Sequence, residues 1–284
     1  MDDNASNSSY RGLSAIPMIY FQQMVLDRSM EPSEWFEMAP TLGLDATEIH
    51  DQSLRSREQG YLEEIAEQVR ANGLQVSQLI GAADLTNPDR EARRAELERT
   101  YRNIDAAAIL GGTCLRMTAG QEHPGLSHAE GVDLAVDGIK RALEYAEGKG
   151  VLLAYENHWK DYFWSRPDFS QRSTVFLQVL EGLRDTPLRV NFDCSNQVVA
   201  GEDPVGLLEQ VRDRVVHVHC SDRLEVGKYP HAVTGEGVVD YPAIFRLLKE
   251  IGYDSWLSIE YGGEEGLDGL KRSIANVRRL WANA

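Results

Sequence analysis

The chain has 284 residues, of which 42% are hydrophobic and 26% are charged, and this composition is typical of a globular protein with a sizeable core. Its formal net charge of −16 disfavours binding to nucleic acid, which attracts clustered lysine and arginine. No apolar run reaches the roughly 18 residues of a membrane span. We therefore expect neither a nucleic-acid partner nor a membrane partner.

Residues 1–9 are polar and acidic, and they lack the basic and apolar segments of a signal peptide. We expect them to form a disordered tail, and residues 10–284 to form one domain of a cytoplasmic protein. The cysteines Cys114, Cys194 and Cys220 form no CxxC pair, which predicts reduced thiols rather than disulfides.

Hydrophobic periodicity predicts alternating strands and helices through the first half of the chain. Asn87 is the expected cap of the long third helix, which should end at Gly111 and Gly112. Glu48 and His50 should share the inward face of the second strand, because side chains alternate along a strand. Strands are expected over residues 13–20, 46–50, 74–80 and 114–117, and helices over residues 32–42, 61–72, 87–110 and 132–146.

The alternation continues to the C-terminus, with strands that end at or near Glu156, Asp193, His219 and Glu260. Helices are expected over residues 174–183, 204–211, 241–251 and 267–281. Strand–helix units repeated without a composition break predict an α/β fold of one domain, a (β/α)8 TIM barrel of parallel strands covered by helices. No dinucleotide-binding fingerprint follows the first strand, which disfavours a doubly wound open sheet.

The second-half strands share a pattern in which one face is apolar and the other ends on a carboxylate or an imidazole. His217 and His219, for example, share one face of their strand, opposite valine side chains. At the mouth of a barrel, Glu156, Asp193, His219 and Glu260 would converge, and the carboxylates would repel one another unless a cation lay between them. These side chains suit one divalent ion, Mn²⁺, Mg²⁺, Co²⁺ or Zn²⁺. The strand pattern therefore predicts a metal site.

Other side chains near the strand ends are candidates for binding a substrate. Arg116 would either hold an anionic or hydroxyl-rich substrate or neutralise the carboxylates. The aromatic-rich loop over residues 158–172 would either cover a sugar as a partial lid or pack on the barrel or a neighbouring subunit. The candidate substrate-binding residues from these patterns are Glu48, His50, Arg116, Trp159 and His231.

The glycines of Gly235-Glu236-Gly237 superficially resemble a phosphate-binding loop. They lead to Asp240 and the dipeptide Tyr241-Pro242, which favours a turn followed by a helix cap. The sequence contains no Gly-x-Ser-x-Gly elbow and no HExxH pair, so neither a serine hydrolase nor a zincin protease is supported.

With these motifs in place, the chain resembles the xylose-isomerase-like TIM barrels, a superfamily of sugar phosphate isomerases and epimerases that also includes inosose dehydratase and endonuclease IV. The resemblance covers the chain after its tail. It implies the barrel fold, and it implies Glu156, Asp193, His219 and Glu260 as the metal ligands. Its most specific motifs are Glu156-Asn157-His158, Asn191-Phe192-Asp193, His217-Val218-His219 with Asp222, Gly235-Glu236-Gly237 and Ser258-Ile259-Glu260-Tyr261.

Departures from the family pattern bear on the substrate. Asn196 stands where many members place a substrate-binding histidine, and it is the expected substrate contact at that position. Tyr162 and Glu225 stand where tagatose and psicose 3-epimerases carry a second glutamate and an arginine, which disfavours classical ketose 3-epimerase activity. His231 matches one further zinc ligand of endonuclease IV, but Asn196 and Tyr229 replace others, which disfavours DNA repair.

The resulting expectation is a divalent-metal-dependent isomerase or epimerase that acts on a sugar or polyol ketone through an enediolate. Glu156 and Glu260 would exchange protons with the two reacting carbons. The alternative is a lyase or dehydratase acting on a 3-keto sugar or inosose, because both reactions begin with the same proton loss. A DNA repair enzyme and a non-catalytic sugar-binding module are less favoured, and assembly into a homo-oligomer is left open.

Overall fold

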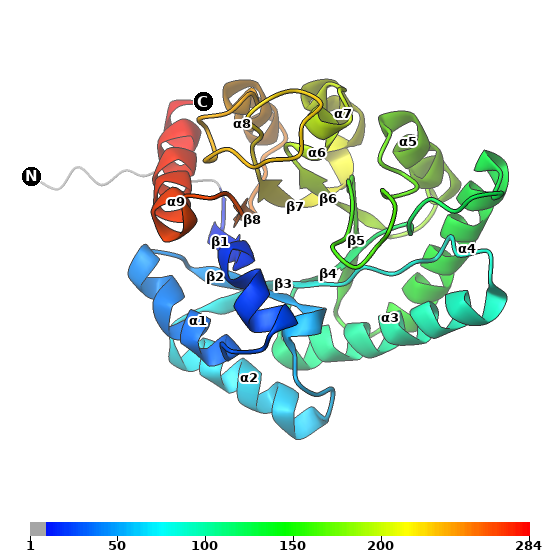
Figure 1. The fold of residues 1–284 in the computed structure, drawn as a ribbon, viewed down its shortest axis with the longest axis horizontal. Coiled ribbons are helices and arrows are strands. Elements are labelled where there is room, and N and C mark those ends of the chain that lie inside the picture. The colour runs from blue at the N-terminus through cyan, green and yellow to red at the C-terminus, as the bar shows by residue number, and fades with distance from the viewer. Residues whose placement is uncertain (1–9) are drawn as a thin grey trace, which may run out of the picture.

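A computed structural model describes residues 10–284, and the tail expected over residues 1–9 lies outside the described part. Eight parallel strands form a nearly closed barrel with helices around it (Figure 1). This is the predicted (β/α)8 TIM barrel. The strands are β1 (Gly12–Ile16), β2 (Ala46–His50), β3 (Gln75–Ile80), β4 (Cys114–Met117), β5 (Leu152–Glu156), β6 (Arg189–Asp193), β7 (Val215–Cys220) and β8 (Trp256–Glu260).

The helices pack their apolar faces on the outer side of the strands. In α8, for example, Ile244, Phe245 and Leu248 recur at helical spacing and are fully buried. Within residues 10–284, no helix is both long and apolar enough to cross a membrane. The helices are α1 (Pro32–Met38), α2 (Gln59–Ala71), α3 (Arg90–Leu110), α4 (His128–Ala146), α5 (Ser173–Gly182), the short α6 (Asn196–Val199), α7 (Pro204–Val211), α8 (Tyr241–Glu250) and α9 (Gly266–Asn283).

The barrel has a seam between β1 and β2, which are the two ends of the hydrogen-bonded strand order β1-β8-β7-β6-β5-β4-β3-β2. Asp45 bridges this seam, because its Oδ2 accepts a hydrogen bond from Leu13 N (2.9 Å) and its own N–H donates to Leu13 O (2.8 Å). Gly12 makes room for the carboxylate, since a Cβ there would lie 2.9 Å from Asp45 Oδ2 and 2.8 Å from the Trp256 ring. The side chain of Asp45 therefore connects β1 to the start of β2, between which no regular β ladder forms.

Polar side chains fill the inside of the barrel below its C-terminal mouth. They alternate along the strands with the apolar residues that face the helices, and the residues of this layer that are fully buried include Ser14, Gln78, Asn191, His217 and Ser258. The interior of such barrels is ordinarily filled by branched aliphatic side chains. A polar interior therefore indicates that this layer supports a site at the mouth.

The first strand is shorter than predicted. It ends at Ile16 rather than at residue 20, and Met18–Tyr20 forms a 3₁₀ turn that leads into a π-helical turn over Gln22–Leu26. Pro17 interrupts the strand, because proline has no N–H for a β ladder. The apolar residues after Pro17 led the sequence analysis to predict a strand that continues past Ile16, where β1 ends.

Two helix starts also differ from prediction. α3 begins at Arg90, and its cap is Asp89 rather than Asn87, because the Asp89 carboxylate accepts hydrogen bonds from the first backbone N–H groups of the helix (2.8 and 3.3 Å). Asn87 instead accepts from Asp89 N (3.0 Å) in the turn before it. α4 begins earlier than expected, where Ser127 and Glu130 form a capping box.

Candidate metal centre

The ends of four strands bring the predicted ligands together at the mouth of the barrel. One donor atom from each of Glu156, Asp193, His219 and Glu260 lies within 4.8 Å of the others. His219 Nδ1 is 2.8 Å from Glu156 Oε1 and 3.1 Å from Glu260 Oε2. The side chains of Glu156 and His219 are buried, whereas that of Glu260 is 17% exposed. The cluster therefore opens to solvent on the side of Glu260.

The turn that follows β6 fixes the orientation of Asp193. Its Oδ1 accepts hydrogen bonds from Ser195 N (2.9 Å) and Asn196 N (2.6 Å), and its Oδ2 accepts from Ser221 Oγ (2.7 Å). Burial raises the pKa of Asp193 to about 7, and the nearby charges of Glu260 and Glu156 contribute to that rise. Asp193 is therefore rigidly held in a place where negative charge is costly.

Arg116, on β4, is paired with one carboxylate of the cluster. Its Nη1 lies 2.7 Å from Glu156 Oε2, and its Nε donates to Gly81 O (3.0 Å). Burial raises the pKa of Glu156, but Arg116 and His219 outweigh burial and bring that pKa below its usual range. Of the two roles that the sequence left open for Arg116, the observed contact corresponds to neutralising a carboxylate.

The chemistry of the donor set fits a divalent cation. The cluster holds three carboxylates, of which Glu156 is paired with Arg116, and the charges of Glu260 and Glu156 add to burial in raising the pKa of Asp193. Ligands bound to a single ion at about 2.1 Å lie about 3 Å apart, which matches the separations of 2.8 and 3.1 Å around His219 Nδ1. The cluster could therefore hold a metal through three carboxylate oxygens and one imidazole nitrogen.

The loop between β7 and α8 is anchored by Asp222. Its carboxylate accepts hydrogen bonds from Gly235 N (2.9 Å), Gly237 N (3.0 Å) and Val239 N (3.1 Å). Asp240 then caps α8 by accepting from a backbone N–H of the first turn (3.1 Å). The interpretation of this glycine segment as a turn followed by a helix cap is confirmed.

The same loop carries His231, which is half-buried and lies edge-on to the ring of Tyr229 at 5.9 Å. Burial and the nearby guanidinium of Arg223 lower the pKa of His231 to about 4. The imidazole is therefore neutral at physiological pH. The charge of Glu260 acts on His231 in the opposite direction, which places the two side chains close to each other.

The other substrate-side candidates lie at different depths. His50 borders a cavity of about 240 Å³ that Asp161 and Phe163 also line, and its Nδ1 accepts a hydrogen bond from Gln52 N (3.1 Å). Trp159 is half-buried in the loop after β5. Asn196 is buried beside Asp193.

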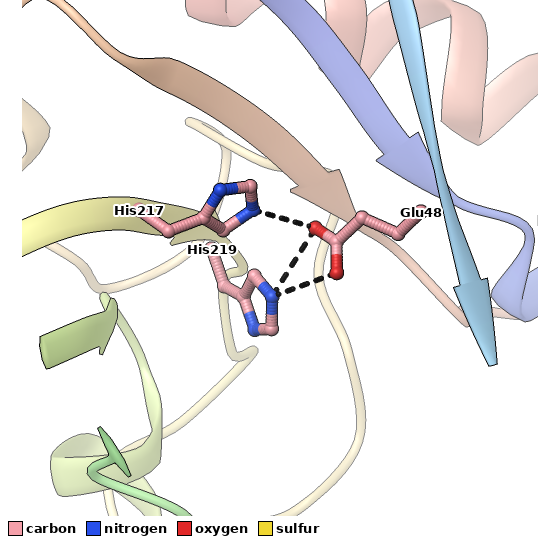
Figure 2. Close-up of side chains that lie close together, drawn as sticks. All are labelled: Glu48, His217 and His219. Carbon is pink, nitrogen blue, oxygen red and sulfur yellow. Dashed lines mark hydrogen bonds and ion pairs between the residues drawn. The ribbon is translucent and has the colours of Figure 1, made fainter. Parts of the chain in front are cut away.

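Glu48 lies deeper than the sequence suggested. It is 1% exposed, and its carboxylate faces the imidazoles of His217 and His219 (Figure 2). Burial raises the pKa of Glu48, but the two imidazoles outweigh burial, and the pKa falls below its usual range. Its carboxylate is therefore engaged by protein groups rather than open towards a substrate.

Arg223 was missed by the sequence reasoning. It is 1% exposed, and its guanidinium donates to Ser195 Oγ (2.9 Å), Asn196 Oδ1 (3.3 Å) and Tyr229 O (2.6 Å). It therefore ties the turn after β6 to the loop after β7. The available signal was its position directly after the strand-end motif that finishes with Asp222, but nothing local showed that the side chain turns inward.

The chain belongs to the xylose isomerase-like TIM barrel family, whose model matches residues 36–280. It is similar to inosose dehydratases from Clostridium beijerinckii (26% identical over 144 residues, 45% of this chain and 46% of that protein) and from Clostridium botulinum (27% identical over 144 residues, 45% and 46%). The matched segment spans about half the length of these relatives.

Solved structures of several enzymes share the fold over almost the whole chain. D-psicose 3-epimerase from Clostridium cellulolyticum H10 has a TM-score of 0.76 at 14% identity and covers 95% of this chain and 99% of its own. A probable 3-DHS dehydratase from Bacillus anthracis has a TM-score of 0.75 at 17% identity and covers 94% and 98%. At these identities the likeness establishes the fold alone, and epimerases and dehydratases both occur on it.

Proposed function

We propose that the protein is a divalent-metal-dependent enzyme that removes the α-proton of a sugar or polyol ketone, and that it acts as a sugar isomerase or epimerase. The convergence of Glu156, Asp193, His219 and Glu260 in one cluster carries this proposal. A divalent ion bound there would stabilise the negative charge that develops on adjacent substrate oxygens as the proton leaves. Membership of a family with epimerase and dehydratase structures supports an enzymatic role.

Glu260 and Glu156 are the proton-transfer residues in this proposal. A base must reach within hydrogen-bond distance of the proton that it removes. Glu260 is the more open of the two at 17% side-chain exposure, whereas Glu156 is 1% exposed and has its Oε2 bound to Arg116. Glu260 therefore removes the first proton, and Glu156 returns one through Oε2, because its Oε1 faces the metal position beside His219 Nδ1.

The side chains around the cluster provide donors for substrate hydroxyls. Nδ1 of His50 accepts a backbone N–H, so the neutral ring carries its proton on Nε2 and can donate it to a hydroxyl. His231, also neutral at physiological pH, lies on the side of Glu260. We place Trp159 beside the sugar ring as a stacking surface, because it is the half-buried tryptophan of the aromatic loop.

The second candidate is dehydration of an inosose or a 3-keto sugar. The same proton loss would then be followed by departure of a hydroxyl group from the β-carbon. The similarity to inosose dehydratases favours this outcome. The presence of Tyr162 and Glu225 in place of the glutamate and arginine of ketose 3-epimerases favours it further.

The test is a screen of keto sugars and inososes with Mn²⁺ in D₂O, scored by NMR for isomerised and eliminated products. Deuterium should appear at the α-carbon because a carboxylate exchanges its proton with solvent. Glu260→Gln should lower kcat by about 10²–10⁴-fold, and Glu156→Gln should also lower it. Glu264→Gln changes an exposed glutamate in the loop that follows Glu260 and β8; it is the matched control and should keep full activity.

Two results would contradict the assignment. Complete retention of the substrate hydrogen would indicate a hydride shift in place of proton transfer. A fully active Glu260→Gln variant would remove Glu260 from the role of base. Formation of eliminated product alone would select the dehydratase over the isomerase while leaving the proton-transfer step intact.

A further inference from the structure

Glu48 of β2 contacts two histidines of β7, and it meets His219 on the Nε2 side of the ring, opposite the other candidate ligands (Figure 2). Glu48 Oε1 lies 2.9 Å from His217 Nε2 and 3.2 Å from His219 Nε2, and Glu48 Oε2 lies 3.2 Å from His219 Nε2. The three side chains are at most 1% exposed. The strands that contribute them are far apart in the sequence, so the contact depends on closure of the barrel.

The hydrogen-bonding capacity of these groups fixes where the protons lie. An ionised carboxylate only accepts hydrogen bonds, so both imidazoles must donate to Glu48 through Nε2–H. Nδ1 of His219 faces Glu156 Oε1 and Glu260 Oε2, and because Nε2 keeps its proton for Glu48, Nδ1 is the nitrogen that would give up its proton and offer its lone pair to a metal ion. Glu48 thus selects the tautomer and the ring orientation in which Nδ1 of His219 is free to bind a metal.

His217 has a narrower set of contacts. Its Nε2 donates to Glu48, whereas its buried Nδ1 has no hydrogen-bond partner among the described residues. An unpaired buried nitrogen lowers the stability of the fold. The position of the His217 ring therefore satisfies the contact between Nε2 and Glu48 and leaves Nδ1 unsatisfied. The contact explains why a second histidine precedes His219 on the same face of the strand.

From this network we infer that Glu48 and His217 are positioning residues for the metal ligand His219. Glu48 holds the imidazole of His219, and His217 holds the carboxylate of Glu48. The inference rests on the proposed metal site and extends it to a layer of the barrel interior that touches neither metal nor substrate. Gln78 Oε1 lies 3.3 Å from His219 Nε2, but the side chain of Gln78 also donates to Cys114 Sγ (3.2 Å), so it supplements Glu48.

The test measures Mn²⁺ binding to metal-free protein by titration calorimetry. Wild type should bind about one ion per chain. Glu48→Gln should keep this stoichiometry and weaken affinity by about 10–100-fold, because the amide N–H₂ that replaces one carboxylate oxygen opposes the N–H of an imidazole. Ser77→Ala is the matched control: it removes a buried polar group from the barrel interior, where Ser77 Oγ lies 2.6 Å from Ser14 Oγ, and it should bind as wild type does.

A second pair of variants tests the role of His217 independently of Glu48. His217→Leu removes the donor to Glu48 and should weaken Mn²⁺ binding, whereas His217→Gln keeps an N–H donor and should restore affinity to within a few-fold of wild type. Circular dichroism and thermal melting of the metal-free variants identify any variant that fails to fold. A structural role alone would lower the melting temperature of both His217 variants without separating their metal affinities.

The outcomes separate this inference from the proposed function. If wild type binds no divalent ion, the proposed metal site fails. If wild type binds one ion and both Glu48→Gln and His217→Leu bind it equally well, only the positioning role is overturned. A stoichiometry of two ions that falls to one in Glu48→Gln would also overturn it, because the Glu48, His217 and His219 group would then be a second metal site.

Discussion

At the scale of single residues, Gly237 in the loop after β7 has no room for a larger side chain. A Cβ at this position would overlap Arg223 O and Asp222 Oδ1, the carboxylate oxygen that accepts from Val239 N. Neither atom can move freely, since one belongs to the backbone and the other anchors the loop. The glycine is therefore required by close packing.

We expect Gly237→Ala to lower the free energy of unfolding by about 1–3 kcal/mol, the usual cost of forcing an extra methyl group into a packed site. Denaturant melts of both proteins measure the difference. Gly60→Ala is the control, because a Cβ at Gly60 meets no atom within 4 Å. It lies in α2 and should be neutral or slightly stabilising. Equal stability of Gly237→Ala and wild type would show that the loop can shift away from Asp222.

At the scale of elements, the two tryptophans of the loop between β5 and α5 differ in burial, although the sequence suggested that the aromatic residues of this loop act together. Trp164 is 8% exposed and packs edge-on to His158 at 5.7 Å. Trp159 is half-buried. Tyr162 and Phe163 are exposed and gather around Phe21, with ring centroids 5.1 and 6.3 Å from it. One part of the loop, at Trp164, is therefore packed in the interior, and another part, at Tyr162 and Phe163, presents exposed aromatic rings.

This division predicts opposite effects for two variants. Trp164→Ala should lower the free energy of unfolding by about 3–5 kcal/mol, as expected for a buried tryptophan. Trp159→Ala should leave the melting temperature nearly unchanged and raise KM for a substrate found in the screen. Thermal melts and steady-state kinetics measure both effects. If Trp159→Ala shows a normal KM, the stacking role proposed for Trp159 is wrong.

The strand pattern predicted the four candidate ligands but not the buried residues that hold them in place. Convergence of Glu156, Asp193, His219 and Glu260 was predictable because alternation along a strand and the strand end are both local properties. The depth of Glu48 was not, since it depends on the height of β2 relative to β7 across the barrel and on a register shift at Glu48 against β3. The inward turn of Arg223 likewise depends on partners that are distant in the sequence, Ser195 and Asn196 after β6.

At the scale of the whole molecule, we expect the buried charges of the ligand cluster to couple binding of the proposed metal to stability. Adding Mn²⁺ to metal-free protein at 100 times its Kd should stabilise the fold by about 2.7 kcal/mol. For a domain of this size that corresponds to a rise in melting temperature of about 5–10 °C. Calorimetric melts with chelator and with added Mn²⁺ measure the shift. His219→Ala should show little Mn²⁺-dependent shift, and an unchanged wild-type melt would argue against the metal site.

The seam between β1 and β2 has a consequence for how the barrel opens. Two hydrogen bonds between Leu13 and Asp45 connect the strands at this seam, whereas continuous β ladders connect the other neighbouring strands of the described residues. Fluctuations that separate neighbouring strands should begin at this join, so amide protons along it should exchange with solvent sooner than those of β6 and β7. Since Glu48 lies on β2, such opening would separate its carboxylate from the imidazole of His219, and a bound ion would then leave more readily through the open side of the cluster at Glu260.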